Sequence, residues 1–218
     1  MLRINVVTIF PEFFAAPLGL SIPSRAKDAG GVEYHVVDLR DFTHDRHRTV
    51  DDAPYGGGPG MVMKPGPFFE AVEALGATAP IVLMSARGRQ FTQADAARFA
   101  EGTELTLLCG HYKDVDQRVA DYLATEEISL GDFVLSGGEP AALAVIDATV
   151  RLLPGAMSDL ESARTDSFYD RELSAPSYTR PAVYRDYAVP DVLVSGDHKK
   201  IAEWREREGK RLSEKRKP

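Results

Sequence analysis

The sequence is poor in cysteine and has no long apolar run. Cys109 is the single cysteine among 218 residues, which excludes an internal disulfide framework. No charged segment followed by an apolar stretch opens the chain, and no apolar run is long enough to span a bilayer. These absences predict a soluble cytoplasmic protein without a membrane partner.

Motifs for nucleotide phosphates and metals are also missing. The chain has no G-x-x-x-x-G-K-[ST] segment, and no G-x-G-x-x-G follows its first expected strand. Its five histidines include no pair at a spacing typical of metal ligands. A nucleoside triphosphate site of the usual kind is therefore disfavoured, and no metal ligand is predicted.

Charge is distributed unevenly along the chain. The net charge is -7, but residues 199–218 carry +5, which leaves -12 on residues 1–198. A basic C-terminal segment permits RNA binding, because lysine and arginine attract the phosphate backbone. A solvated helix end would have the same composition, so charge alone does not decide between them.

Hydrophobic patterning alternates between strands and helices. Strands are expected at residues 3–10, 32–39, 81–84, 104–109 and 127–130, with helices at 67–75, 92–100 and 139–153 and another starting at residue 12. Such alternation predicts an α/β fold with a mostly parallel sheet, and a hydrophobic content of 44% is enough for a real core. Residues 1–154 are expected to form this domain.

The rest of the chain has a different pattern. Residues 155–175 lack hydrophobic periodicity and are rich in Ser, Asp and Arg, which predicts an interdomain linker. Asp197 is suited to cap a helix that runs to Leu212, with Ile201 and Trp204 on one face. Residues 176–218 are therefore expected to form a small C-terminal helical domain.

The most unusual segment is residues 40–61, RDFTHDRHRTVDDAPYGGGPGM. It combines cations, imidazoles and carboxylates with a run of glycines, so it is predicted to be a loop and not a core element. Long loops with glycines that permit close approach are commonly functional, and this one suits a polyanion. A solvated surface loop remains the alternative.

Three expected strands end in loops of small residues, at 85–88, 109–112 and 129–139. Ligands of open α/β sheets bind beyond the carboxyl ends of the strands, so these loops are expected to share one pocket. Glycines and exposed backbone groups suit an adenine and ribose bound by main-chain hydrogen bonds. Ordinary turns would also have this composition.

Five motifs, in order along the chain, carry a resemblance to a known family. They are residues 41–61, CGHYKDVDQRV at 109–119, GDFVLSGGE at 131–139, RLLPG at 151–155 and DSF at 166–168. The chain resembles the bacterial tRNA (guanine-N1)-methyltransferases of the SPOUT class. The resemblance implies a deep trefoil knot that binds S-adenosylmethionine, a homodimer with active sites at the subunit interface, and methylation of guanosine 37 in tRNA.

The resemblance also implies a catalytic pair. Guanine N1 carries a proton, so methylation requires a base and a cation that stabilises the charge arriving on O6. Asp166 matches the family's base and Arg151 matches the cation. A helix cap by Asp166 and a helix-dipole interaction by Arg151 are the structural alternatives, and both can coexist with catalysis.

The remaining site residues are carried over by position in the motifs. The residues implied to bind the donor are Leu83, Met84, Ser85, Ala86, Gly88, Gly110, Tyr112, Leu130, Gly131, Asp132, Phe133, Val134, Leu135, Gly137 and Gly138. The residues implied to contact tRNA are His44, Arg46, His47, Asp51, Gly57, Gly58 and Arg180. Mg²⁺ is associated with the family, although no dedicated ligand cluster is present.

One residue departs from the family pattern. Many members have Glu where Lys113 stands, near the positive charge of the donor, and Lys113 reverses the sign. Either Asp114 or Asp116 supplies the carboxylate instead, or donor binding depends more on backbone contacts.

Two other functions stay open: another SPOUT RNA methyltransferase acting on a ribose or a different base, and a tRNA-binding module without catalysis.

Overall fold

The computed structural model describes residues 1–157, 166–168 and 173–216. The chain divides into two compact units, Met1–Ser158 and Asp159–Pro218.

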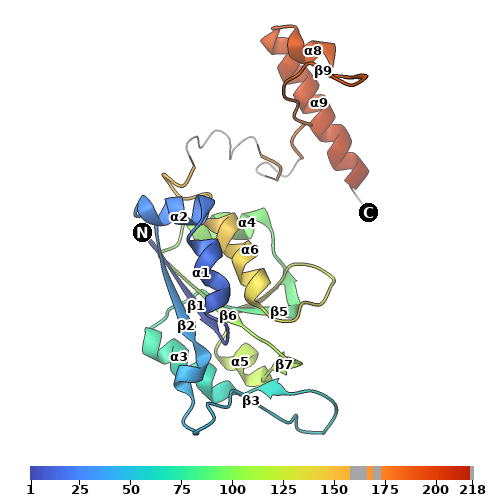
Figure 1. The fold of residues 1–218 in the computed structure, drawn as a ribbon. Helices are drawn as coiled ribbons and strands as arrows, with labels where there is room; N and C mark the ends of the chain where they lie inside the picture. Colours follow the sequence, from blue (N-terminus) through green and yellow to red (C-terminus); the bar gives the residue numbers. More distant parts are fainter. Residues whose placement is uncertain (158–165, 169–172, 217–218) are drawn as a thin grey trace. The chain divides into compact units, whose positions relative to one another are not determined.

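The first unit contains a five-stranded sheet in the order β2-β1-β6-β5-β8 (Figure 1). Its strands are β1 (Leu2–Thr8), β2 (Val32–Asp38), β5 (Ile81–Gln90), β6 (Glu104–Cys109) and β8 (Glu126–Ser129). All neighbouring strands pair in parallel. The α/β fold and the parallel sheet predicted from the alternation are therefore confirmed.

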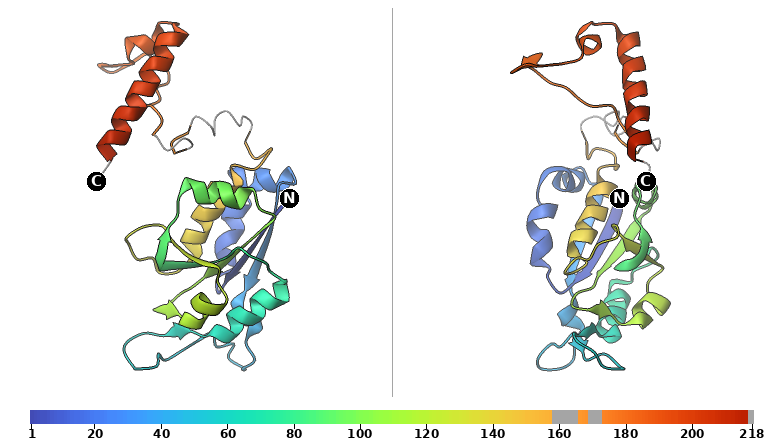
Figure 2. Two further views of the ribbon diagram at one scale, coloured as in Figure 1. Left: turned by 180° about the vertical axis from the view of Figure 1, so that it is seen from behind. Right: turned by 90° about the vertical axis from the view of Figure 1, so that its right-hand side faces the viewer.

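Both faces of this sheet are covered, because successive side chains of a strand point to opposite faces. On one face, Val82 and Met84 of β5 belong to a core formed with α1 (Glu12–Leu18), α2 (Ser21–Asp28), α4 (Gln93–Ala100) and α6 (Glu139–Val150). On the other, Ile81 and Leu83 belong to a core formed with α3 (Pro65–Leu75) and α5 (Gln117–Tyr122). The views in Figure 2 show the two helical layers.

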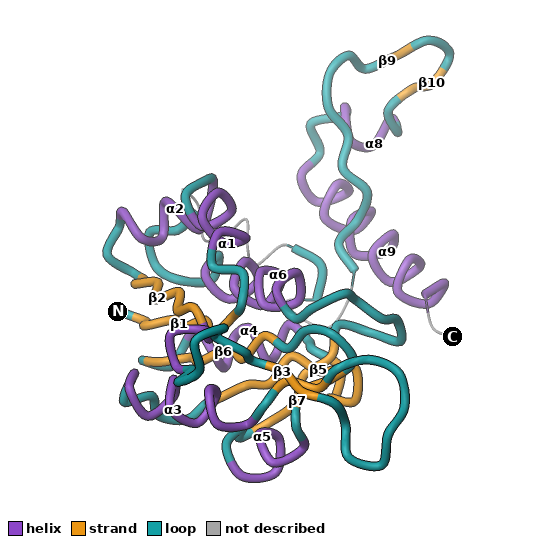
Figure 3. The backbone as a smooth tube through the Cα atoms, turned by 60° about the horizontal axis from the view of Figure 1, so that its bottom comes forward, coloured by secondary structure: helices purple, strands orange, loops and turns teal. Residues whose placement is uncertain are grey.

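A second, smaller sheet lies beside α5. It consists of β3 (Asp51–Asp52), β4 (Val62–Met63) and β7 (Asp114–Val115), with β3–β4 antiparallel and β4–β7 parallel. The loop between β3 and β4 extends away from this sheet (Figure 3). Residues 40–61 are thus largely the predicted loop, but they also contain most of a short 3-10 helix, η1 (Leu39–Phe42), and one edge of the small sheet.

Several boundaries differ from the sequence prediction. β5 continues to Gln90 with a register shift between Met84 and Arg89, where the sequence predicted an end at residue 84. The helix predicted to reach residue 153 ends at Val150. Helix α2 was not predicted, and it tolerates Pro23 because a proline in the first helical turn removes no intrahelical hydrogen bond.

In the part of the second unit that the structure describes, the chain forms a hairpin and two helices. The elements are β9 (Val183–Tyr184), β10 (Tyr187–Ala188), α8 (Asp191–Val194) and α9 (His198–Arg216). Asp197 accepts a hydrogen bond from the Lys200 amide at 3.1 Å, and Trp204 packs against Tyr178 with ring centroids 6.3 Å apart. Within the described parts of the chain, every helix is too short or too polar to cross a membrane.

Candidate functional site

The ends of β5, β6 and β8 surround a cavity of about 190 Å³ in the first unit. These strands are neighbours in the parallel sheet, so their carboxyl ends meet at one edge. The residues predicted to bind the donor all line this cavity, except Gly88 and Asp132. The prediction that the three small-residue loops share a pocket agrees with this placement.

Gly88 supports the cavity without lining it. A Cβ at this position would lie 2.4 Å from the Ile128 amide nitrogen and 2.5 Å from the Glu127 carbonyl carbon. Because both neighbours are backbone atoms of β8, no rotamer change could make room for a side chain. Gly88 therefore allows the segment after Met84 to cross directly against β8.

Three further glycines bring the other loops together. The Gly138 amide donates to the Gly110 carbonyl at 2.8 Å, and His111 and Gly137 form an isolated antiparallel bridge. A Cβ on Gly138 would lie 2.9 Å from Cα of Cys109, and one on Gly110 would lie 2.6 Å from a methyl of Val115. Close backbone approach is thus the reason for glycine at these positions.

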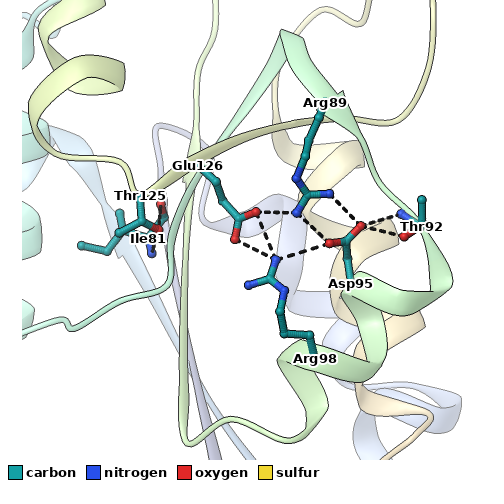
Figure 4. Close-up of polar contacts among 7 residues, drawn as sticks. All are labelled: Ile81, Arg89, Thr92, Asp95, Arg98, Thr125 and Glu126. Atoms are coloured by element: carbon teal, nitrogen blue, oxygen red, sulfur yellow. Dashed lines mark hydrogen bonds and ion pairs between the residues drawn. The ribbon is translucent and has the colours of Figure 1, made fainter.

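A cluster of four charged side chains holds the segment that follows Gly88 (Figure 4). Arg89 donates to both carboxylate oxygens of Asp95, at 2.8 and 2.6 Å, and to Glu126 at 2.5 Å. Arg98 bonds the same two acids, at 3.3 Å to Asp95 and 2.8 Å to Glu126. The cluster joins β5, α4 and β8 close in sequence to residues 85–87, which line the cavity.

A buried carboxylate lies below the cavity. Glu139 is 3% exposed and accepts a hydrogen bond of 2.7 Å from the Thr8 hydroxyl. Nδ1 of His111 is 3.7 Å from the other carboxylate oxygen, and the His111 ring packs edge-on against Phe10 and Tyr112. A Cβ on Gly137 would come within 2.4 Å of both polar groups, so glycine is needed there as well.

Cys109 lies beside this carboxylate and is completely buried. Burial raises the pKa of its thiol well above the usual value, and the charge of Glu139 acts in the same direction. A thiol kept protonated is a poor nucleophile. Cys109 therefore acts as a small buried hydrophobe.

Tyr112 adopts a positive φ of 61° and leaves 46% of its side chain exposed. Its ring therefore lies at the cavity and not in the core. The backbone strain at this residue turns the chain from β6 into β7.

The outer rim of the cavity is charged. Arg87 pairs with Asp114 at 3.0 Å, and both line the cavity together with Lys113. Asp116 instead caps α5 through the Arg118 amide and pairs with the Arg118 side chain at 2.8 Å. Of the two acids considered as substitutes for the family's glutamate, Asp114 is at the cavity and Asp116 is not.

The sequence did not single out all of the lining residues. Those missing from the prediction are Arg87, His111, Lys113, Asp114, Val115, Ile128, Ser129, Ser136 and Ala141. His111 and Asp114 stand in the same motif as Gly110 and Tyr112, and that proximity is the signal that could have identified them.

The residues predicted to contact tRNA are spread over several elements. His44, Arg46 and His47 are exposed, and His44 pairs with Glu70 at 2.8 Å. Gly57 and Gly58 have φ values of 76° and 110° and lie in the exposed loop between β3 and β4. Asp51 belongs to β3, whereas Arg180 belongs to the second unit.

The two predicted catalytic residues belong to different units. Arg151 is the C-cap residue of α6, where a cation interacts favourably with the helix dipole. Asp166 is exposed in the second unit and lines a separate cavity there with Tyr178 and Arg180. The dipole interaction considered for Arg151 is thus compatible with its position.

The segment that carries Asp166 is attached to α9. The Leu173 amide donates to the Ser213 hydroxyl at 2.8 Å, and the Ser174 amide donates to the Ser167 hydroxyl at 3.0 Å. The guanidinium of Arg216 lies 4.7 Å from the ring centroid of Phe168. Phe168 and Ser167, the neighbours of Asp166, are therefore tied to the rest of the second unit.

Metal binding has little support in the geometry. In the ranges that the structure describes, no three or more His, Cys, Asp or Glu side chains are grouped so that they could hold a metal ion. Asp114, which lines the cavity, is paired with Arg87, and the buried Glu139 accepts a hydrogen bond from Thr8.

Comparisons with known proteins give a consistent result. The family profile described as tRNA (Guanine-1)-methyltransferase TrmD matches residues 2–218. A Gloeobacter violaceus protein named tRNA (guanine-N(1)-)-methyltransferase is 50% identical over 220 residues, which cover 100% of this chain and 97% of that protein. Proteins with the same name from Dehalococcoides mccartyi strain CBDB1 and Geobacillus kaustophilus are 49% and 47% identical, again over 100% of this chain and over 89% and 90% of their own lengths.

Proposed function

The chain belongs to the tRNA (guanine-1)-methyltransferase family, and we propose that it transfers a methyl group from S-adenosylmethionine to N1 of guanosine 37 in tRNA. The observation that carries this proposal is the cavity at the carboxyl ends of β5, β6 and β8. Two of its lining segments, within residues 110–115 and 131–138, belong to motifs that the sequence shares with the family. A tRNA substrate is consistent with the cytoplasm as the place of action.

The lining of the cavity fits the proposed methyl donor. Leu83, Met84 and Ile128 are buried and give an apolar wall suited to an adenine ring. The glycines at positions 110, 137 and 138 carry no side chain, so the donor can approach the backbone closely there. Asp114 supplies a carboxylate at the rim, where a cationic amine of the donor would be stabilised.

The proposed chemistry assigns one role to each catalytic residue. The carboxylate of Asp166 removes the proton from guanine N1, and Arg151 stabilises the negative charge that develops on O6. When bound, the donor supplies a methyl group on a positively charged sulfur. N1 then forms the new bond to carbon, and the bond between that carbon and the sulfur breaks.

We also propose a homodimer in which Asp166 of one chain acts at the cavity of its partner. Support comes from the loop after β8, where Val134 is 88% exposed and Phe133 is 55% exposed beside the cavity. Exposed apolar residues of this kind are typical of a surface that a partner covers. The second unit, with Arg180 and the lysine- and arginine-rich helix α9, is proposed to bind tRNA.

The trefoil knot that the resemblance implies belongs to the same proposal. Its support is the close crossing of Gly88 over the backbone of β8, together with the hydrogen bond between the loops at Gly110 and Gly138. Chain crossings this tight are uncommon in open sheets, whose connections rarely thread through loops.

The test is to incubate the purified protein with S-adenosylmethionine and an unmodified tRNA transcript, and then to map modified nucleosides by mass spectrometry. We expect 1-methylguanosine next to the anticodon, and none with a transcript that carries adenosine at that position. A methyl group on a ribose, or on another base, would overturn the proposal.

A further inference from the structure

We propose that Lys113, at the rim of the donor cavity, binds a phosphate group of the RNA and does not bind the methyl donor. The inference rests on the proposed function and concerns the residue that reverses the sign of the family's usual glutamate.

The backbone fixes Lys113 beside the glycine loop, defined as residues 56–60. The Lys113 amide donates to the Met61 carbonyl at 3.1 Å, immediately before β7 pairs with β4. A Cβ on Gly60 would lie 3.2 Å from Cβ and 3.4 Å from Cδ of Lys113. The stem of the lysine therefore packs along the glycine loop, and a side chain on Gly60 would displace it.

The amine of Lys113 reaches the middle of the same loop. A Cβ on Gly58 would lie 3.8 Å from Nζ of Lys113, whereas one on Gly56 or Gly57 would meet nothing within 4 Å. The loop is exposed along its whole length. A ligand backbone can therefore approach both the loop and the amine from solvent.

The charges near Lys113 are already paired with one another. Arg87 pairs with Asp114, the residue after Lys113, and Arg118 pairs with Asp116. Across the described residues, no carboxylate oxygen lies within 4.0 Å of the Lys113 amine. The positive charge is thus available for an anion from outside the chain.

Electrostatics favour RNA over the donor as the source of that anion. The donor carries a sulfonium and an ammonium group against one carboxylate, so a lysine beside it faces a net positive ligand. RNA carries one negative charge per nucleotide, and lysine binds phosphate as a point charge.

A fully exposed aromatic side chain supports the same assignment. Tyr55 precedes the glycine loop and is 101% exposed. An aromatic ring in solvent offers a face on which a base can stack, and single-stranded RNA is commonly bound by stacking together with backbone charge. Tyr55 and Lys113 would thus hold a base and a phosphate on either side of Gly58.

The experiment measures binding of an unmodified tRNA transcript to the full chain without donor, over a series of KCl concentrations. For Lys113→Gln we expect roughly two- to fivefold weaker binding at low salt, with the slope of log K against log salt reduced by about 0.7 to 1. Lys113→Arg should retain the wild-type slope. The dissociation constant for S-adenosylmethionine, measured by calorimetry, should stay within about twofold in both variants.

Lys27→Gln provides the matched control. Lys27 is exposed in the last turn of α2, just before β2 begins, so it lies at the amino ends of the strands, opposite the cavity. Lys27→Gln removes the same charge as Lys113→Gln, and we expect it to leave the slope of log K against log salt for tRNA binding unchanged.

An unchanged slope in Lys113→Gln, or weakened donor binding in place of weakened RNA binding, would overturn the inference. Because the RNA measurement needs no turnover, its result is independent of whether 1-methylguanosine forms. Failure of the proposed reaction and failure of this assignment can therefore be told apart.

Discussion

Gly88 and Ile128 approach so closely that the missing Cβ of Gly88 would lie 2.4 Å from the Ile128 amide nitrogen. The contact joins β5 to β8 where the chain leaves the sheet to form the cavity. A side chain at position 88 would clash with the backbone of β8, and no rotamer change could relieve that clash. The effect of such a side chain on stability can therefore be measured.

The variant Gly88→Ala should lose about 1–3 kcal/mol of unfolding free energy and bind S-adenosylmethionine several-fold more weakly. The added methyl group must push β8 away from β5, which distorts the cavity wall. Urea unfolding and calorimetry measure the two effects. Gly66→Ala in α3 is the control, since nothing lies within 4 Å of a Cβ there, and it should be neutral or slightly stabilising.

The variant Asp166→Asn should lower kcat by about 10²- to 10⁴-fold, because an amide cannot accept the N1 proton. The donor dissociation constant should stay within about twofold. Asp186→Asn, an exposed residue in the same unit, makes the same chemical change and should retain wild-type kinetics. Full activity of Asp166→Asn would exclude this residue as the base.

Asp95 should make the stability of the protein depend on pH. Burial alone would raise the pKa of Asp95, but hydrogen bonds from Arg89 and Thr92 outweigh it and hold the pKa well below its ordinary value of 3.8. A carboxyl group whose pKa is lower in the folded state stabilises the fold above its unfolded pKa, and this stabilisation is lost as the pH falls towards the folded pKa.

The variant Asp95→Asn should therefore lose about 1–3 kcal/mol of unfolding free energy at pH 7. The difference from the wild type should narrow as the pH falls below about 4. Urea unfolding curves at several pH values measure this difference in unfolding free energy. Asp121→Asn, exposed in α5, should change the stability by less than about 0.5 kcal/mol. A constant difference for Asp95→Asn across this range would contradict the role of its charge.

Cys109 should be inert in the native protein. Its thiol is buried and its pKa is raised, so a maleimide or disulfide reagent should label it only after denaturant is added. Labelling at pH 8 with and without urea, read by intact mass, tests this. Rapid labelling of the native protein would mean that the strand ends near Glu139 open readily.

The sequence predicted those elements that are determined by the pattern of apolar and polar residues within a short segment. The strand at residues 104–109 agrees with the structure residue for residue. Four of its six residues are apolar, and the strand lies in the centre of the sheet. The three loops that share the cavity were also expected together, since parallel strands bring their carboxyl ends to one edge.

Features that depend on contacts between distant segments were not predicted. The charge cluster unites Arg89 with Glu126, and the buried Glu139 meets Thr8 from the first strand. Each partner alone is an ordinary polar residue in its own segment. The small sheet of β3, β4 and β7 was missed for the same reason, because strands of two residues have no periodicity to detect.

The attachment of the Asp166 segment to α9 has a mechanical consequence. Leu173 is hydrogen-bonded to Ser213, and the Phe168 ring packs against Arg216, so two residues of the segment that carries the proposed base contact the long basic helix. On the proposed function, docking of that helix along a tRNA would deliver the carboxylate to the purine in the same motion. The guanine of an RNA that does not bind this helix would remain unmethylated. Selectivity for the RNA substrate would then depend on binding to the helix as well as on the cavity.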